Sequence, residues 1–147
     1  MIKAPEGAAR YTAAVEITGE GRNGGVVRAM DGRLEHRLAV PKELGGVGGA
    51  TNPEQLFAAG WGGCFLTALR AAAAQRGIRP TGSEITVEVT LHHGEDGDLS
   101  LSAVLTPRLS GVDQQTAEEL AAIAHRNCPY SRATRGNISV VVNACAM

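Results

Sequence analysis

Apolar and polar residues alternate in two segments near the start of the chain, residues 11–18 and 33–40. Residues 11–18 alternate along their whole length, which is typical of a half-buried β-strand. Residues 26–30 and 33–40 predict two further strands. The glycine-rich residues 19–25 connect the first two strands, and Asp31-Gly32 is a strong hairpin signal between the second and third.

The longest apolar run, residues 56–74, predicts a long helix. Asn52 is a good N-cap, Pro53 suits the first helical position, and Gly77 suits the far end. The run is long enough to cross a membrane, but it contains Arg70 and lacks an aromatic belt at its far end. We therefore predict a buried helix and no membrane span. A helix that is apolar on nearly all sides needs cover on all sides, so in this short chain we expect a partner subunit to supply part of it.

The second half of the chain begins with another predicted hairpin. Residues 83–92 and 99–109 have the pattern of strands, and residues 94–98 have the glycine and aspartate composition of a turn. Residues 137–144 predict a closing strand.

A second helix is predicted between the hairpin and the closing strand. We expect it to begin at a Ser110 cap, with Asp113 three residues later, and to run to about Arg126. Pro129 prevents its continuation. The resulting order, βββ-α-ββ-α-β, predicts an α+β fold with antiparallel sheets in a single domain over residues 1–147.

Composition and charge narrow the classes of function. The formal net charge of −1 and an aromatic content of 3% give no sign of a nucleic-acid surface. The first residues lack the apolar core and the cleavage site of a secretory signal. Three cysteines are an odd and sparse set for a disulfide scaffold. Together these features predict a cytoplasmic protein in a reducing compartment.

The motifs of metal and nucleotide sites are missing. The chain has no CxxC pair, and His92 and His93 point to opposite faces if they lie on a strand. The glycine-rich segment before the long helix lacks both GxGxxG and the GK[ST] ending. Spacing alone gives no Ser-His-Asp set. We therefore expect no bound metal or cofactor.

The three cysteines differ in their predicted surroundings. Cys64 lies in the middle of the long helix, where a free cysteine is often only a small buried hydrophobe. A reactive Cys64 needs a cation close by, and its own helix supplies none. Cys128 follows the second helix, in a turn from which it can approach a second thiol or remain isolated. Cys145 is two residues from the C-terminus, and we expect it to be exposed and incidental.

Arg22 and Glu54 are further candidates. Arg22 lies in the glycine-rich connection, where it is either a solvated turn charge or a mobile cation that reaches a substrate. Glu54, in the first helical turn, interacts favourably with the helix dipole. It is ten residues from Cys64, or about 15 Å along a straight helix, so the two meet only if the helix breaks at its glycines or if they come from different subunits. Other arginines compete with Arg22: Arg28, Arg33, Arg37, Arg126, Arg132 and Arg135.

Two long motifs carry a resemblance to a known family. PKELGGVGGATNPEQLFAAGWGGCFL, residues 41–66, and CPYSRATRGNISV, residues 128–140, closely resemble the organic hydroperoxide resistance proteins. These belong to the wider group that includes the osmotically inducible peroxidases. The resemblance extends from Tyr11 to about Val142. One departure is Trp61, where the family usually carries tyrosine.

The resemblance implies an OsmC-like fold, with sheets wrapped around long central helices in an intertwined homodimer whose two sites lie at the subunit interface. It implies a thiol-dependent peroxidase that reduces alkyl and lipid hydroperoxides to alcohols in the response to organic peroxide stress. Cys64 matches the peroxidatic cysteine and Cys128 the resolving cysteine, which traps the sulfenic acid as a disulfide. Arg22 matches the arginine at the thiolate, and Glu54 the acid that pairs with it. The implied reductant is a dithiol, the lipoyl group of lipoylated enzyme subunits.

We also expect an apolar pocket beside Cys64, and two other functions remain open for the chain. A wall of apolar side chains would favour organic hydroperoxides over hydrogen peroxide, although each candidate can equally be core packing. A redox sensor or small-molecule carrier on the same fold would not turn over with a reductant, and a general disulfide exchanger would need no peroxide. The wall candidates are Leu56, Phe57, Trp61 and Phe65.

Overall fold

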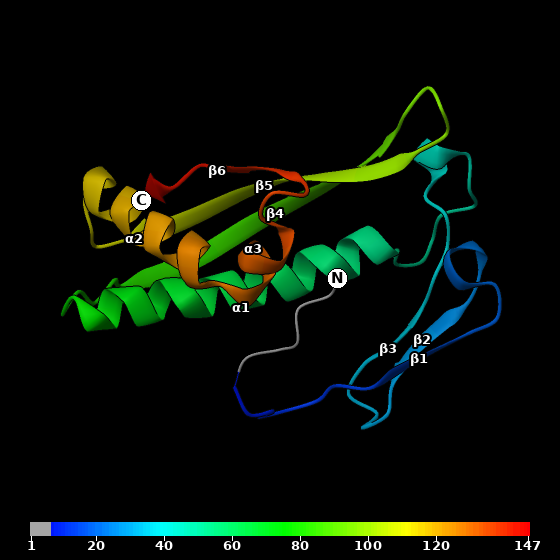
Figure 1. The fold of residues 1–147 in the computed structure, drawn as a ribbon, viewed down its shortest axis with the longest axis horizontal. Coiled ribbons are helices and arrows are strands. Elements are labelled where there is room, and N and C mark those ends of the chain that lie inside the picture. Colours follow the sequence, from blue (N-terminus) through cyan, green and yellow to red (C-terminus); the bar gives the residue numbers. More distant parts are fainter. Residues whose placement is uncertain (1–6) are drawn as a thin grey trace. The chain divides into compact units, whose positions relative to one another are not determined.

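The computed structural model describes residues 7–147. The chain divides into two compact units, and the boundary along the chain falls between Pro53 and Glu54. A three-stranded sheet lies in the first unit and a four-stranded sheet in the second (Figure 1). The fold class is therefore α+β, as predicted, while the assignment of all 147 residues to one domain stays a prediction.

The N-terminal unit is an antiparallel meander, as the alternating pattern predicts. Strands β1 (Val15–Thr18), β2 (Val26–Ala29) and β3 (Glu35–Arg37) pair in sequence order. They are shorter than the alternating segments. Two short 3₁₀ helices, η1 (Gly21–Asn23) and η2 (Lys42–Leu44), lie in the loops.

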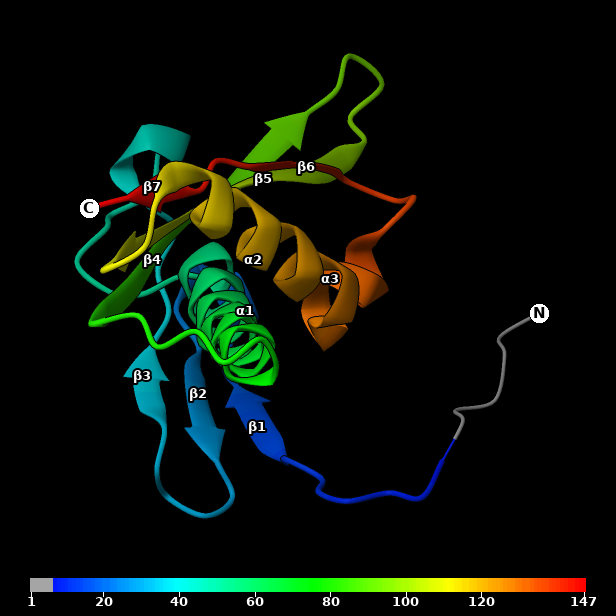
Figure 2. The ribbon, with the colours of Figure 1, turned by 90° about the vertical axis from the view of Figure 1, so that its left-hand side faces the viewer.

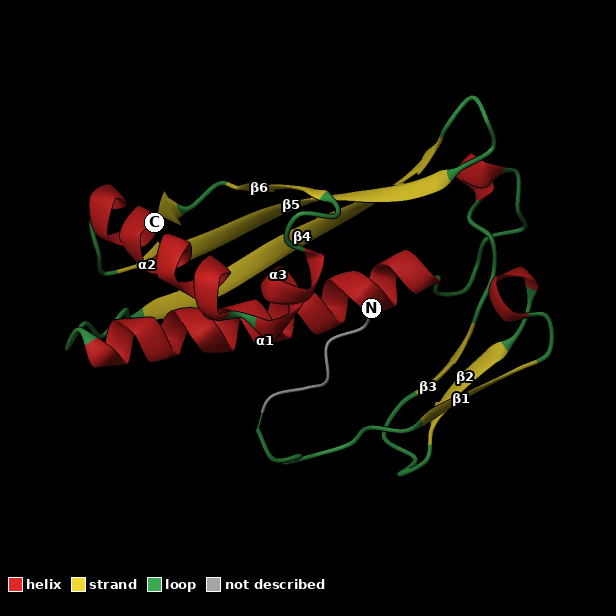
Figure 3. Ribbon diagram, in the orientation of Figure 1, coloured by secondary structure: helices red, strands yellow, loops and turns green. Residues whose placement is uncertain are grey.

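The C-terminal unit is built on a long hairpin, the two yellow strands β4 and β5 of Figure 3. β4 (Gly82–His93) and β5 (Leu99–Ser110) pair antiparallel over twelve residues each. The last strands, β6 (Ser139–Val142) and β7 (Cys145–Ala146), both pair parallel to β5. This sheet is therefore mixed rather than purely antiparallel, because the chain crosses over through helices before it returns to β5.

Helix α1 (Pro53–Gln75) runs without a break. Its buried side chains recur every three or four residues, among them Trp61, Phe65 and Leu69, so one stripe of the helix faces the core of the unit. Gly62 allows a close approach to β4, because a Cβ there would lie 3.2 Å from Val87 Cγ2. With a mean hydropathy of 1.3, α1 also has the length and composition of a membrane-spanning helix, a test that the core helices of soluble proteins pass as well.

Two further helices pack beside α1 on the same side of the sheet (Figure 2). α2 (Gln114–Asn127) begins at Asp113, whose side chain accepts a hydrogen bond from the Thr116 N–H. The predicted cap, Ser110, is instead the last residue of β5. A short third helix, α3 (Pro129–Thr134), was not predicted and follows Cys128 directly.

Candidate functional site

Cys64 lies in the middle of α1 and is half-buried. Phe57, Gly60, Trp61 and Cys64 are three or four residues apart, so they form one stripe along the helix. The sulfur therefore lies one turn beyond the Gly60–Trp61 pair and two turns beyond Phe57.

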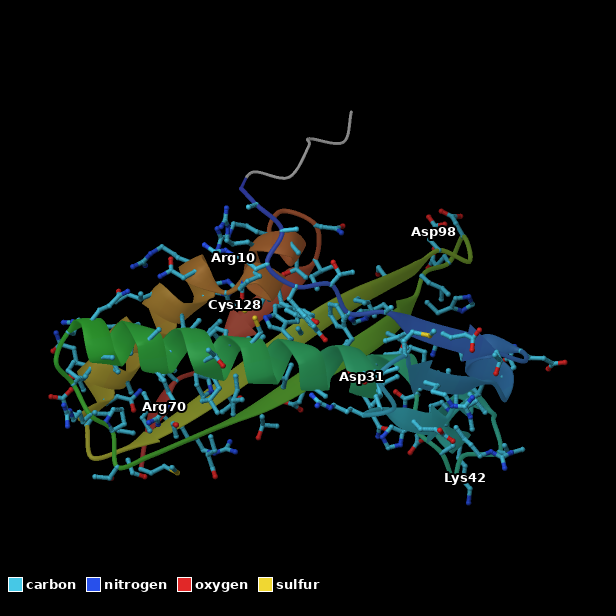
Figure 4. All side chains as sticks on the ribbon, turned by 90° about the horizontal axis from the view of Figure 1, so that it is seen from below. Arg10, Asp31, Lys42, Arg70, Asp98 and Cys128 are labelled. Carbon is cyan, nitrogen blue, oxygen red and sulfur yellow. The ribbon has the colours of Figure 1, made fainter. Side chains whose placement is uncertain are left out.

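Cys128 is fully buried between α2 and α3, and Figure 4 labels it against the middle of α1. It ends one helix and begins the next: its N–H donates to the carbonyl of Ala124 at 2.8 Å, and its carbonyl accepts from the Arg132 N–H at 2.9 Å. Its backbone is extended, with φ −60° and ψ 124°, as the ring of the following Pro129 requires. The turn thus fixes the Cys128 thiol toward α1.

The structure brings the Cys64 and Cys128 thiols together across 64 residues of sequence. Both cysteines are free, and a side-chain hydrogen bond joins their sulfur atoms. Burial raises the pKa of the Cys64 thiol, and the charge and the hydrogen bond of Cys128 raise this pKa further. One backbone hydrogen bond, from Tyr130, acts in the opposite direction. This dithiol pair is the centre of the candidate site.

The first turn of α3 is fastened to α1 next to the dithiol pair. The Trp61 indole Nε1–H donates to Ser131 Oγ at 3.1 Å, and both side chains are fully buried. Tyr130, the preceding residue, contributes its N–H to the Cys64 sulfur and packs its ring edge-on against Phe57. These contacts hold Cys128 and the Tyr130 amide at the Cys64 sulfur.

The four predicted wall residues separate into two groups. Trp61 and Phe65 have no exposed surface and belong to the core of the unit, so we no longer assign them to a substrate wall. Leu56 and Phe57 are half-buried and retain surface for a ligand. The physical reason is the width of the buried stripe on α1, which takes in residues 61 and 65 and leaves residues 56 and 57 at its edge.

Arg22 lies in the N-terminal unit, on η1 of the β1–β2 connection. The connection is a closed turn rather than an open loop, because the Gly25 N–H donates to the Gly21 carbonyl at 2.8 Å. Gly25 is required there, since a Cβ would collide with the carbonyl oxygen of Thr18. The role of Arg22 at the Cys64 sulfur stays a prediction.

Two of the competing arginines have other partners. Arg28 forms an exposed ion pair with Glu35 at 2.9 Å. Arg135 donates to the carbonyl of His125 at 2.8 Å, at the C-terminal end of α2. Both guanidinium groups therefore have partners other than the Cys64 sulfur.

Glu54 lies in the first turn of α1. Because α1 is continuous through Gly60, Gly62 and Gly63, the alternative in which a helix break brings Glu54 to Cys64 of the same chain is wrong. The other alternative, Glu54 of one subunit beside Cys64 of another, stays a prediction.

Cys145 is half-buried on β7 rather than exposed, and β7 pairs with β5 at Arg108. Its thiol donates a weak hydrogen bond to the Asn143 carbonyl at 3.8 Å. Within residues 7–147, no three His, Cys, Asp or Glu side chains are grouped to hold a metal ion.

Sequence reasoning missed Tyr130 and Ser131, although both lie in the CPYS segment that it singled out. From the sequence, Pro129 is expected to end the second helix and to fix the backbone beside Cys128, but not to begin a third helix. Proline is also common at the first position of a helix, and that preference was the available signal for α3.

The amino-acid sequence is similar to a described protein family and to individual proteins. A sequence model described as OsmC-like protein matches residues 46–143. The organic hydroperoxide resistance protein of Xanthomonas axonopodis pv. citri (strain 306) is 42% identical over 134 residues, which cover 90% of this chain and 92% of the relative.

Solved structures agree with the sequence comparison. The crystal structure of an organic hydroperoxide resistance protein from Legionella pneumophila superposes with a TM-score of 0.88 at 44% identity, over 95% of this chain and 100% of that one. The organic hydroperoxide resistance protein OhrB of Bacillus subtilis gives a TM-score of 0.82 at 39% identity, over 91% of this chain and 98% of that one.

Proposed function

We propose a function for this chain from its membership of the OsmC-like family, in the organic hydroperoxide resistance branch. The chain is a thiol-dependent peroxidase that acts in resistance to organic peroxide stress. The names of the relatives support the role in resistance. One observation carries the thiol chemistry, namely the hydrogen-bonded contact between Cys64 and Cys128.

The first step is attack on the peroxide. The Cys64 thiolate attacks the outer, protonated oxygen of the hydroperoxide, and the O–O bond breaks. Cys64 becomes a sulfenic acid, and the departing alkoxide takes up a proton to give the alcohol. Sulfur is oxidised and the peroxide is reduced by two electrons.

The second step traps the oxidised sulfur. The Cys128 sulfur attacks the sulfenic sulfur of Cys64, an S–S bond forms, and the hydroxyl leaves as water with the proton of the Cys128 thiol. The contact between the two thiols supports this step, because Cys128 reaches Cys64 without any movement of α3.

A cation is needed to ionise Cys64. Within its own unit, burial and Cys128 raise the pKa of the thiol, while a single backbone N–H opposes them. We assign the cation to Arg22, whose planar guanidinium can donate to the sulfur and to Glu54 at once. Glu54 acts on the Arg22 guanidinium, which it orients, and not directly on the Cys64 sulfur. An acid alone beside Cys64 would raise the pKa of the thiol further.

The resting state is restored by a dithiol. One thiolate of the reductant attacks the Cys64–Cys128 disulfide, which forms a mixed disulfide and releases one cysteine as thiolate. The second thiolate of the reductant then attacks the reductant's own sulfur in this mixed disulfide, which releases the other cysteine and leaves the reductant as a cyclic disulfide. We assign this role to lipoyl groups on lipoylated enzyme subunits in the cytoplasm. The active form is a homodimer, in which Glu54 of one subunit serves the Cys64 of the other.

Steady-state turnover with cumene hydroperoxide and dihydrolipoamide tests the proposal. Cys64→Ser is expected to abolish turnover. Cys128→Ser is expected to form a trappable sulfenic acid at Cys64 but to stop recycling. Cys145→Ser is the matched control and is expected to turn over like the wild type. A wild-type chain that binds the peroxide without turnover is a carrier or sensor, and that result would overturn the proposal.

A further inference from the structure

The side chain of Tyr130 lies along the same stripe of α1 that carries Cys64. Its N–H donates to the Cys64 sulfur, and its ring packs on Phe57 at a centroid distance of 6.2 Å and an angle of 61°. Its hydroxyl oxygen would lie 2.8 Å from a Cβ at Gly60. The ring therefore extends from the sulfur toward the N-terminal end of α1.

Among the aromatic side chains near Cys64, Tyr130 has the largest exposed fraction. It is 38% exposed, whereas Trp61 and Phe65 are fully buried and Phe57 is half-buried. An organic group held against the stripe, with its peroxide at the sulfur, thus contacts Tyr130 and Phe57 before any other ring.

Hydrogen bonds fix the backbone of α3 at Tyr130. Ser131 accepts from the buried Trp61 indole, and the Tyr130 carbonyl accepts from Thr134 Oγ1 at 2.9 Å. A surface that is already ordered loses little conformational freedom when a ligand binds.

We propose that Tyr130 is a specificity-determining residue, whose ring forms with Phe57 the surface that binds the organic group of an aryl or alkyl hydroperoxide beside Cys64. This inference rests on the proposed peroxidase function and names the residue that selects the substrate. Hydrogen peroxide has no organic group, so it gains nothing from this surface.

The first test measures the rate constant of Cys64 oxidation by stopped flow, with cumene hydroperoxide and with hydrogen peroxide. Tyr130→Ala removes the ring and keeps the N–H at the sulfur. It is expected to lower the ratio of the cumene to the hydrogen peroxide rate constant by roughly two- to tenfold, the range of one aromatic contact. Tyr130→Phe keeps the ring and is expected to keep most of the ratio.

The second test moves the ring without removing it. In Gly60→Ala the new Cβ displaces the Tyr130 hydroxyl, and the ratio is expected to fall. Alanine favours the helix, so this variant is expected to fold. Gly63→Ala is the matched control, because a Cβ there meets nothing within 4 Å. Adding Tyr130→Phe to Gly60→Ala relieves the closest contact and is expected to restore part of the ratio.

The outcomes separate the two proposals. A ratio that stays at the wild-type value in Tyr130→Ala, or rate constants that fall equally for both peroxides, would overturn the role of Tyr130 and leave the peroxidase intact. A wild-type Cys64 that neither peroxide oxidises would overturn both proposals.

Discussion

At Cys64, burial and a neighbouring thiol oppose ionisation, and one backbone N–H favours it. The same contact that raises the pKa places the second sulfur where a disulfide needs it. In the proposed mechanism the contact that favours the resolving step also makes the Cys64 thiol less acidic, and a cation from outside these contacts would compensate. This is the physical reason why we include Arg22 in the proposed mechanism.

The hydrogen bond between Trp61 and Ser131 is a stability determinant at the residue scale. Ser131→Ala leaves the fully buried indole N–H without its acceptor, which is expected to lower the free energy of unfolding by about 1–3 kcal/mol. Denaturant unfolding of Ser131→Ala, Trp61→Phe and the double variant checks the prediction. The cycle is expected to give a coupling of about 0.5–1.5 kcal/mol, and additive losses would contradict it.

His125 is expected to make stability depend on pH. Burial lowers its pKa, and the charge of Arg135 lowers it further, while its buried Nδ1 has no hydrogen-bond partner among the described residues. Because the pKa of His125 is lower in the folded state, its contribution to stability is fully present above the pKa of the unfolded state, near 6.5. This contribution is lost as the pH falls through the pKa of the folded state.

His125→Gln is therefore expected to flatten the fall in the free energy of unfolding between about pH 7.5 and pH 5. Denaturant unfolding at the two pH values measures this difference. The exposed His93→Gln on β4 is the control, and an equal fall in wild type and His125→Gln would refute the role of His125.

At the scale of elements, α1 and the β4–β5 hairpin were predictable because each follows one strong local signal. Pro53 begins α1 as expected, and the apolar residues of β4 recur at every second position. The parallel return of β6 and β7 to β5 was not predictable, because strand direction is set by how the α2–α3 crossover packs. In the site, the CPYS motif identified Cys128, but the placement of Tyr130 follows from tertiary contacts alone.

The start of α2 has two candidate N-cap residues in the sequence, Ser110 and Asp113. Asp113 rather than Ser110 accepts from the Thr116 N–H, because Ser110 still belongs to β5. Asp113→Ala is expected to lower the thermal unfolding midpoint, since it removes an acceptor from the first helical turn. Asp113→Asn is the control and is expected to retain most of the stability, while equal midpoints in wild type and Asp113→Ala would contradict the cap.

At the scale of the whole molecule, much apolar surface remains uncovered in one chain. Only 33% of the most apolar window of α1 is buried, and β1 exposes Val15 and Ile17. Because exposed apolar surface is where subunits associate, we expect a second copy of the chain to cover part of α1. We expect sedimentation equilibrium at micromolar concentration to give twice the 15.2 kDa mass of the chain. A stable monomer, or recovery with the membrane fraction, would contradict the homodimer.

In the proposed mechanism a peroxide oxidises Cys64 and Cys128 traps the product as a disulfide. The most direct measurement is peptide mapping with intact mass after one equivalent of cumene hydroperoxide is added to the reduced protein. We expect the loss of two hydrogens and a single crosslinked peptide that joins Cys64 to Cys128. Unchanged thiols, or a crosslink that involves Cys145 instead, would contradict it.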